Sequence, residues 1–222
     1  MNRDTLLKIQ DITGYVFSDP GLAELAFTHK SFKGAKSNQC MEFFGDSILD
    51  FIVSEIIFRK YTDLDEGELT KLRAAVVSEK PLAAVIKKSG LNEFLIMGKN
   101  EIKQGINENL SVMSDLYEAL LAAVYMDGGL EAAFAFVKKT HSDLIEKKYA
   151  SLKKNGFGDY KSELYEFCAK HNLGLEFVTE KSGAVFVSEA YIEGDFVASG
   201  KGSSKKEAEQ SAAAEACKRL DR

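Results

Sequence analysis

The sequence predicts an all-α domain over residues 1–150, a linker over 151–158 and a small α+β domain over 159–222. Apolar residues recur at helical spacing through most of the first part. The stretch SLKKNGFGD, which begins at residue 151, is polar and holds two glycines. Beyond it, short segments of alternating apolar and polar residues lie between two helical segments. This change of pattern favours two separate domains, the second with the order α-β-β-β-α.

The first part contains several segments with helical patterns. Residues 43–58 form a long apolar run, and 68–88 place apolar residues on one helical face, with a new helix starting near Pro81. Residues 111–126 are rich in Leu and Ala, and Gly128-Gly129 provides a stop. A further amphipathic helix is predicted over 130–148.

The second part reads as a helix over 160–171, strands over 175–181, 184–193 and 196–199, and a helix over 204–220. In the middle strand, alternation predicts four inward-facing side chains. Gly194-Asp195 is the predicted turn before the last strand. The inward-facing residues are Phe186, Ser188, Ala190 and Ile192.

Composition favours a cytoplasmic protein. The chain has 222 residues, 45% of them hydrophobic, and a net charge of −5. Its N-terminal segment lacks the pattern of a secretion signal, and we expect no window to approach the roughly 20 apolar residues that span a bilayer. The cysteines are odd in number and far apart, which predicts neither a disulfide framework nor a zinc site. They are Cys40, Cys168 and Cys217.

Acids interrupt the apolar stretch MEFFGDSILDFIVSE at residues 41–55. Glu42, Asp46 and Asp50 recur every four residues and therefore share one helical face. Like charges at that spacing destabilise a helix by a few tenths of a kcal/mol, roughly. Gly45 lies among them, although glycine within a helix costs about 1 kcal/mol relative to alanine.

A second acidic pair, Asp115 and Glu118, shares one face of the apolar segment 111–126. Two helices that pack with these faces together would form a pocket of carboxylate oxygens, which suits a hard cation such as Mg²⁺. Two such ions activate water and stabilise the leaving oxygen in phosphodiester hydrolysis. Solvated helix faces explain the same acids, and Gly45 could serve helix packing alone. The spacing leaves both interpretations open.

Four blocks closely resemble the ribonuclease III family: LAFTHKSF (25–32), MEFFGDSILD (41–50), DEGELTKLRAAVVSEK (65–80) and SDLYEALLAAVYMDGG (114–129). The resemblance implies a homodimeric, Mg²⁺-dependent endoribonuclease, with Mn²⁺ as a possible substitute. Such enzymes cut double-stranded RNA to 5′-phosphate and 3′-hydroxyl ends, and process ribosomal RNA precursors and messages. The implied metal ligands are Glu42, Asp46, Asp115 and Glu118, with Asp46 and Glu118 catalytic. Gln39 stands where the family often has another acid.

Residues 160–220 resemble a double-stranded RNA-binding domain, most clearly in GKGSSKKEAEQSAAAEACKRL (200–220). Residues 155–222 hold nine Lys or Arg and twelve Asp or Glu, so we expect modest, salt-dependent affinity. The loop after the first strand lacks the usual Pro and His, and Glu209 replaces a common third basic residue. Implied phosphate contacts are Lys201, Lys205 and Lys206, at a helix N-terminus; implied minor-groove contacts are Ser162, Tyr165 and Glu166.

Two other functions compete with this interpretation. A non-catalytic RNA-binding protein would gain nothing from four carboxylates near phosphate without a metal. A helical calcium-binding protein would need an Asp-x-Asp-x-Asp-Gly loop, which is missing. We expect His29 to be structural, and Phe44 and Tyr125 to belong to the core.

Overall fold

The computed structural model describes residues 1–34, 36–155 and 160–220. The chain divides into two compact units, Met1–Lys148 and Tyr149–Arg222. Each unit has its own core and is described separately.

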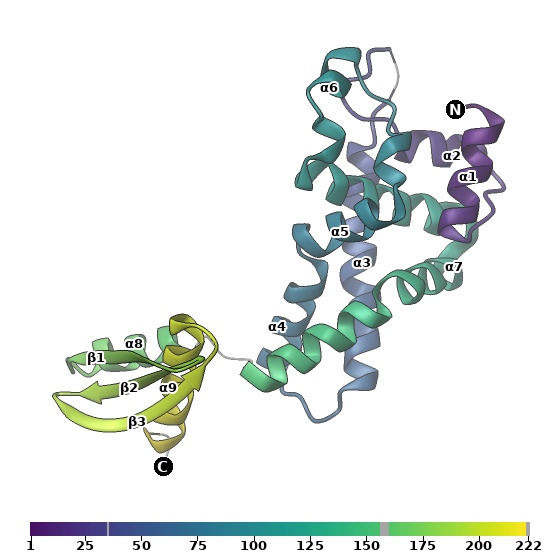
Figure 1. The fold of residues 1–222 in the computed structure, drawn as a ribbon. Coiled ribbons are helices and arrows are strands. Elements are labelled where there is room, and N and C mark those ends of the chain that lie inside the picture. The colour runs from purple at the N-terminus through teal and green to yellow at the C-terminus, as the bar shows by residue number, and fades with distance from the viewer. Residues whose placement is uncertain (35, 156–159, 221–222) are drawn as a thin grey trace. The chain divides into compact units, whose positions relative to one another are not determined.

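The first unit is built from helices, as predicted, and strand-like pairing within it is limited to a bridge between Thr28 and Ile96 among the residues described. Short 3₁₀ turns, Leu91–Phe94 and Ile106–Glu108, connect the later helices. The helices are α1 (Arg3–Thr13), α2 (Pro20–Ala26), α3 (Gln39–Lys60), α4 (Glu66–Val77), α5 (Glu79–Ser89), α6 (Lys99–Lys103) and α7 (Leu110–Asn155), shown in Figure 1.

Helix α7 changes direction at Gly129, whose φ of 73° and ψ of −170° are not helical (Figure 1). The predicted stop at the glycine pair is therefore confirmed, although the helix resumes at once. It then continues to Asn155. Residues 151–155 of the predicted linker are therefore helical, while 156–158 lie outside the described residues, and the domain bounds stay a prediction. The two glycines in SLKKNGFGD suggested a loop, but the residues before them continue the helical pattern.

The core of the first unit lies where α3 meets the first half of α7. Leu49, Ile52 and Val53 of α3 are fully buried, as are Leu120 and Leu121 of α7. Burial of this apolar surface, at about 25 cal/mol per Å², is the main force that holds the two helices together.

One expectation about membranes needs correction. The Leu110–Lys153 part of α7 is long and apolar enough to cross a membrane by length and composition alone. We had expected no such segment. This segment is apolar because it is a core helix. Residues such as Leu116 and Leu120 are buried within the unit, and a core helix passes the same test of length and composition.

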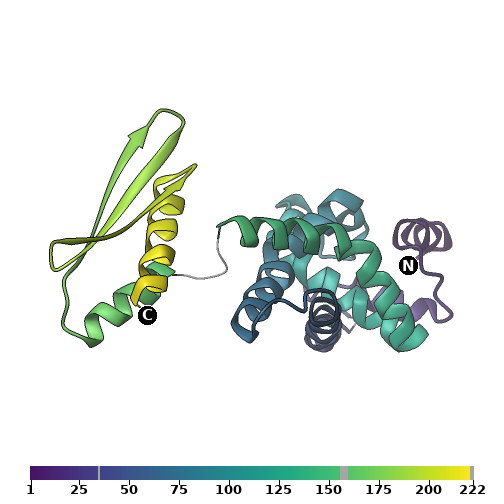
Figure 2. The same cartoon turned by 90° about the horizontal axis from the view of Figure 1, so that it is seen from below.

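The second unit has the predicted α-β-β-β-α order. The three strands form an antiparallel sheet in the order β1-β2-β3, with both helices on one face (Figure 2). Its core joins Leu164 and Cys168 of the first helix to Ala198 of the sheet and Ala213 and Ala216 of the last helix. The elements are α8 (Tyr160–Lys170), β1 (Leu175–Ser182), β2 (Val185–Ile192), β3 (Asp195–Gly202) and α9 (Lys205–Leu220).

The predicted orientation of β2 is confirmed at its centre, because Ser188 and Ala190 are fully buried. Two turns differ slightly from prediction. The β1–β2 turn is only Gly183-Ala184, since β1 runs on to Ser182. The β2–β3 turn uses Glu193 and Gly194, whose φ values are 53° and 84°, as a tight hairpin requires.

Candidate functional site

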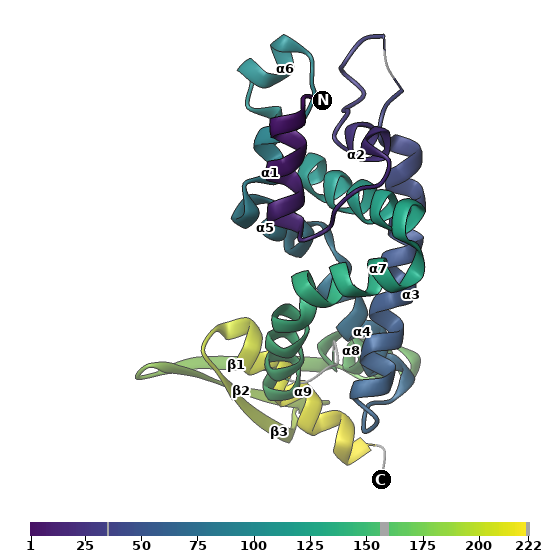
Figure 3. The same cartoon turned by 90° about the vertical axis from the view of Figure 1, so that its right-hand side faces the viewer.

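The site is built where α3 crosses α7 (Figure 3), and Gly45 sets the distance between the two helices. A β-carbon at Gly45 would lie 1.9 Å from the carbonyl oxygen of Glu118 and 2.5 Å from its carbonyl carbon. Contacts that short do not exist in proteins, so only glycine permits this approach. The glycine within the helix thus has a packing role, and that packing brings acids of the two helices together.

Three of the four predicted acids meet at this crossing. One carboxylate oxygen from each of Glu42, Asp115 and Glu118 lies within 4.8 Å of the other two. All three residues are half-buried. Asp46 is exposed and lies outside this group, but its charge acts on Glu118. We call Glu42, Asp115 and Glu118 the acidic triad.

Burial, together with the charges of neighbouring acids, raises the pKa values of Asp115 and Glu118. Burial, followed by the charge of Asp46 and then those of Asp115 and Glu42, raises the pKa of Glu118 to about 8 from 4.5. Burial and the charge of Glu42 raise the pKa of Asp115 to about 6 from 3.8. Carboxylates that burial and mutual repulsion push toward the neutral form gain strongly from a cation between them.

The triad fits a divalent metal ion by its chemistry. It offers oxygen donors only, which Mg²⁺ prefers, and a cation between the carboxylates relieves their mutual repulsion. No cysteine or histidine joins the group among the described residues, which disfavours zinc.

Two charged residues that the sequence does not single out, Lys30 and Glu79, act on the triad. The charge of Lys30 lowers the pKa of Asp115, while the charge of Glu79 raises it. Lys30 belongs to the block LAFTHKSF, and this membership is the sequence feature that could have identified it. Its neighbour His29 is buried, and the His29 ring contacts the Ser31 hydroxyl at 2.8 Å, as expected of a structural residue.

Gln39 is the first residue of α3 and precedes Glu42 by three positions. It is exposed, and its side-chain oxygen accepts a hydrogen bond of 3.2 Å from the Ser37 hydroxyl. A neutral amide thus stands one turn before the triad.

A second candidate surface lies on the other unit. Ser162, Tyr165 and Glu166 are exposed and, three and four residues apart, share one face of α8. The predicted lysines Lys201, Lys205 and Lys206 are exposed at the end of β3 and the start of α9.

The N-terminus of α9 is partly satisfied by its own chain. The backbone N–H of Glu207 donates to the Ser204 hydroxyl at 3.2 Å, and the Glu207 carboxylate accepts from the backbone N–H of Ser203 at 2.8 Å. The Ser204 cap occupies one of the helix N–H donors that we expected to face phosphate. The helix end therefore offers less of its donor set to an anion than the sequence predicts.

Comparison with known proteins gives matches to both units. Residues 19–144 match a family model described as ribonuclease-III-like, and residues 160–220 match the double-stranded RNA binding motif. Ribonuclease 3 of Bacillus cereus (strain AH187) is 36% identical over 233 aligned positions, which cover 98% of this chain and 92% of the relative.

Solved structures agree. The nuclease domain of ribonuclease III from Campylobacter jejuni, in a study of flexibility in a region involved in dimer formation, matches with a TM-score of 0.59 and 37% identity. That match covers 67% of this chain and 99% of the other. Dicer from Pichia stipitis matches 92% of this chain, and 95% of its own, with a TM-score of 0.51 and 26% identity.

Proposed function

Because the chain belongs to the ribonuclease III family and is an endoribonuclease of double-stranded RNA, we propose that its acidic triad and Asp46 bind Mg²⁺ for the cleavage. One observation carries this proposal: the oxygens of Glu42, Asp115 and Glu118 lie within 4.8 Å of one another. We propose that the products carry 5′-phosphate and 3′-hydroxyl ends, with a short 3′ overhang where both strands are cut.

Each acid has a distinct part. Glu42, Asp115 and Glu118 would hold the ion from two helices, and the backbone contact at Gly45 keeps those helices in place. Asp46, exposed beside them, faces solvent and the incoming RNA. We assign catalytic roles to Asp46 and Glu118. When bound, Mg²⁺, or Mn²⁺ as a substitute, supplies Lewis-acid activation of water and neutralises phosphate charge.

The second unit binds the duplex in this proposal. The exposed face of Ser162, Tyr165 and Glu166 suits the wide minor groove of A-form RNA and its 2′-hydroxyls. The lysines at the end of β3 and the start of α9 bind phosphates of the neighbouring groove. They are Lys201, Lys205 and Lys206.

An exposed aromatic stripe on α3 supports a homodimer. Phe44, Phe51 and Phe58 recur every seven residues and lie 40%, 53% and 69% exposed. Phe44 and Tyr125 were expected in the core, but Phe44 is exposed and Tyr125 half-buried, with their rings 5.5 Å apart. Aromatic surface of this extent marks an interaction site on a soluble protein.

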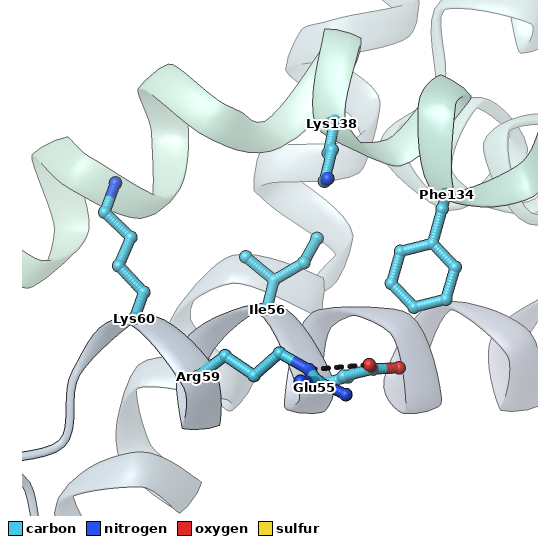
Figure 4. A pocket seen from close by; sticks show the side chains of 6 residues that line it. All are labelled: Glu55, Ile56, Arg59, Lys60, Phe134 and Lys138. Atoms are coloured by element: carbon cyan, nitrogen blue, oxygen red, sulfur yellow. Dashed lines mark hydrogen bonds and ion pairs between the residues drawn. The ribbon is translucent and has the colours of Figure 1, made fainter. Parts of the chain in front are cut away.

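A hollow beside the stripe adds to this argument. It has a volume of about 560 Å³ and lies between α3 and the second half of α7 (Figure 4). Ile56 and Phe134 form its apolar wall, and the Phe134 ring lies 6.4 Å from that of Phe51. Charged groups surround it, including Arg59, which donates to Glu55 at 2.7 Å. None of the predicted metal ligands lines this hollow, so a second copy docked there leaves the triad open to RNA.

A dimer has a mechanistic purpose. Each subunit contributes one acidic site, and two sites in one groove cut the two strands of a duplex. We propose that the substrates include ribosomal RNA precursors and structured messages, and that the enzyme acts in the cytoplasm without membrane attachment.

The direct test is to incubate the protein with long duplex RNA in Mg²⁺ and in EDTA. We expect shortening in Mg²⁺ alone, and loss of cleavage with retained duplex binding for Glu118→Ala. Asp11→Asn is the control, because Asp11 is an exposed acid on α1, outside the triad, the aromatic stripe and the residues that line the hollow. Unchanged turnover in Glu118→Ala would contradict the assignment.

A further inference from the structure

Glu209 is a buried acid within the helix that carries the expected phosphate-binding lysines. Its side chain is only 10% exposed, and it lies one turn after Lys205 on α9. The sequence comparison with related domains suggested a lost basic contact at this position. A buried carboxylate is tolerated when hydrogen-bond donors and cations surround it. The partners of Glu209 indicate that it organises neighbouring side chains, which is more than the loss of a basic contact.

Partners come to Glu209 from several elements. The Lys161 ammonium, on α8, donates to one carboxylate oxygen at 2.7 Å. The Lys205 ammonium lies 3.9 Å from the other oxygen, which also accepts from the Thr179 hydroxyl of β1 at 3.4 Å. The side-chain oxygen of the next residue, Gln210, accepts a hydrogen bond of 3.2 Å from the backbone N–H of Lys161. Glu209 and Gln210 thus connect the start of α9 to the first turn of α8.

These contacts of Glu209 and Gln210, called the bridge below, join the two surfaces that we propose for RNA binding. The Lys161 ammonium lies 5.9 Å from the ring centroid of Tyr165, a proposed minor-groove contact, and 5.4 Å from that of Phe177. Lys205 is a proposed phosphate contact and its side chain is 69% exposed. One carboxylate therefore contacts a cation beside the proposed minor-groove surface and a cation of the proposed phosphate-binding surface.

We propose that Glu209 is a positioning residue that holds Lys161 and Lys205 as one phosphate-binding pair, which makes Lys161 a further RNA contact. This inference rests on the proposed RNA contacts of the second unit. A free lysine loses side-chain entropy when it is fixed, whereas the Lys161 ammonium is already bound to Glu209 at 2.7 Å and the Lys205 ammonium lies 3.9 Å from it. The pair with its carboxylate still has a net charge of +1, so phosphate remains attracted. Preorganisation of this kind matters in a domain whose total charge is negative.

The test measures duplex RNA affinity of the full chain in EDTA at several salt concentrations. Glu209→Gln keeps the size of the side chain but removes its charge. We expect affinity to fall about tenfold, and the slope of log K against log salt to decrease by about 1 or 2 as phosphate contacts are lost. Simple charge removal predicts the opposite, namely tighter binding. Unchanged or tighter binding of Glu209→Gln therefore overturns the proposal.

Glu215→Gln is the matched control. Glu215 is an exposed acid on the same helix and pairs with Lys218 at 2.8 Å, so its loss changes net charge equally without touching the bridge. We expect wild-type or slightly tighter binding. Thermal melting of each variant identifies a temperature at which all are folded, and binding is measured there. A purely structural defect lowers the melting temperature but leaves the salt slope unchanged.

Lys161→Met provides a second measurement if Glu209→Gln does not fold. This variant leaves Glu209 its contacts with Lys205 and Thr179. We expect the salt slope to decrease by about 1, and wild-type affinity and slope would overturn the proposal. If the wild-type chain itself fails to bind duplex RNA, the proposed RNA interface fails instead, which separates the two ideas.

Discussion

Gly45 of α3 touches the backbone of Glu118 of α7 so closely that a β-carbon at Gly45 would fall 1.9 Å from the Glu118 carbonyl oxygen. The contact joins the two helices at the residue that also supplies a proposed metal ligand. Helix packing and the proposed metal binding consequently both depend on the lack of a side chain at Gly45.

Replacing Gly45 by alanine is expected to separate the helices at the site. Overpacking of this kind destabilises proteins by about 1–3 kcal/mol, which exceeds the roughly 1 kcal/mol that alanine gains in a helix. A displacement of the ligands near 1 Å costs about 100-fold in rate. Urea unfolding followed by circular dichroism, together with duplex cleavage rates, measures both effects.

Gly67→Ala serves as the control for that substitution. Gly67 lies in the first turn of α4, and a β-carbon there would meet only the Asp65 carboxylate at 3.4 Å, an acceptable contact. We expect unchanged or slightly higher stability and normal cleavage. If Gly45→Ala behaved like Gly67→Ala, the close approach of α3 and α7 would not be important for the site.

The pH dependence of stability should report on the acidic triad. The pKa values of Asp115 and Glu118 are raised to about 6 and about 8, above their ordinary values of 3.8 and 4.5. The folded state therefore holds these protons more tightly than the unfolded state. This contribution to stability is fully present below about pH 4 and is lost as the pH rises through the two folded-state values.

We therefore expect the contribution of these acids to the melting temperature in EDTA to decrease between about pH 5 and about pH 9. Mg²⁺ competes with the protons, so it should raise the melting temperature more at the alkaline end. Calorimetry with and without Mg²⁺ measures this difference. The doubly substituted Asp115→Asn, Glu118→Gln protein should lose the Mg²⁺ effect, and an equal Mg²⁺ effect at both pH values would refute the prediction.

The aromatic stripe on α3 predicts that a charge will separate the dimer. Phe58 is 69% exposed, so Phe58→Glu should leave the subunit folded while it places a carboxylate in the interface. We expect the dimer dissociation constant to rise at least about 100-fold, as for other unpaired charges buried at interfaces. Sedimentation velocity measures the change, and the monomer should nick duplexes rather than cut both strands.

Val16→Glu is the corresponding control, because Val16 is 73% exposed but lies in the loop between α1 and α2, away from the stripe. It should sediment like the wild-type protein. A wild-type chain that is monomeric at all concentrations would contradict the dimer itself.

Asp127 is an acid on α7 with a structural role. Its carboxylate accepts hydrogen bonds of 2.8 Å from the Tyr15 hydroxyl and from the backbone N–H groups of Ser18 and Asp19. These bonds lower the pKa of Asp127, although burial opposes them. The stability that they provide is present at neutral pH and is lost as the pH falls through the lowered pKa.

Asp127→Ala should reduce the free energy of unfolding by about 1–3 kcal/mol while cleavage by the folded protein remains near normal. Asp143→Asn, at an exposed acid of the same helix, should change neither property. Loss of cleavage without loss of stability in Asp127→Ala would instead indicate a catalytic function for this acid.

Local patterns were sufficient for much of the fold. Alternation identified Ser188 and Ala190 as inward-facing, and helical spacing located the helix around Glu42. The same patterns were misleading where contacts between residues distant in sequence decide whether a side chain is buried. Phe44 is apolar enough for a core, yet it is exposed on a face that the single chain leaves uncovered. Residues 151–155 are helical, although the polar composition and the glycines of SLKKNGFGD favour a loop.

Glu209 shows the same limit at the RNA-binding surface. By residue type it counted as a missing basic contact, because its partners on α8 and β1 are distant in sequence. Only the folded unit brings Lys161 and Thr179 to its carboxylate.

By itself, the sequence determined the two-domain class, most helices and strands, and the acids available for a metal, because these follow from residue chemistry and near-neighbour spacing. The tertiary structure decided which acids meet. Glu42, Asp115 and Glu118 converge and Asp46 stays at the exposed edge, since the outcome depends on where α3 crosses α7. That crossing is set by backbone contact at Gly45, a distance that no local spacing encodes.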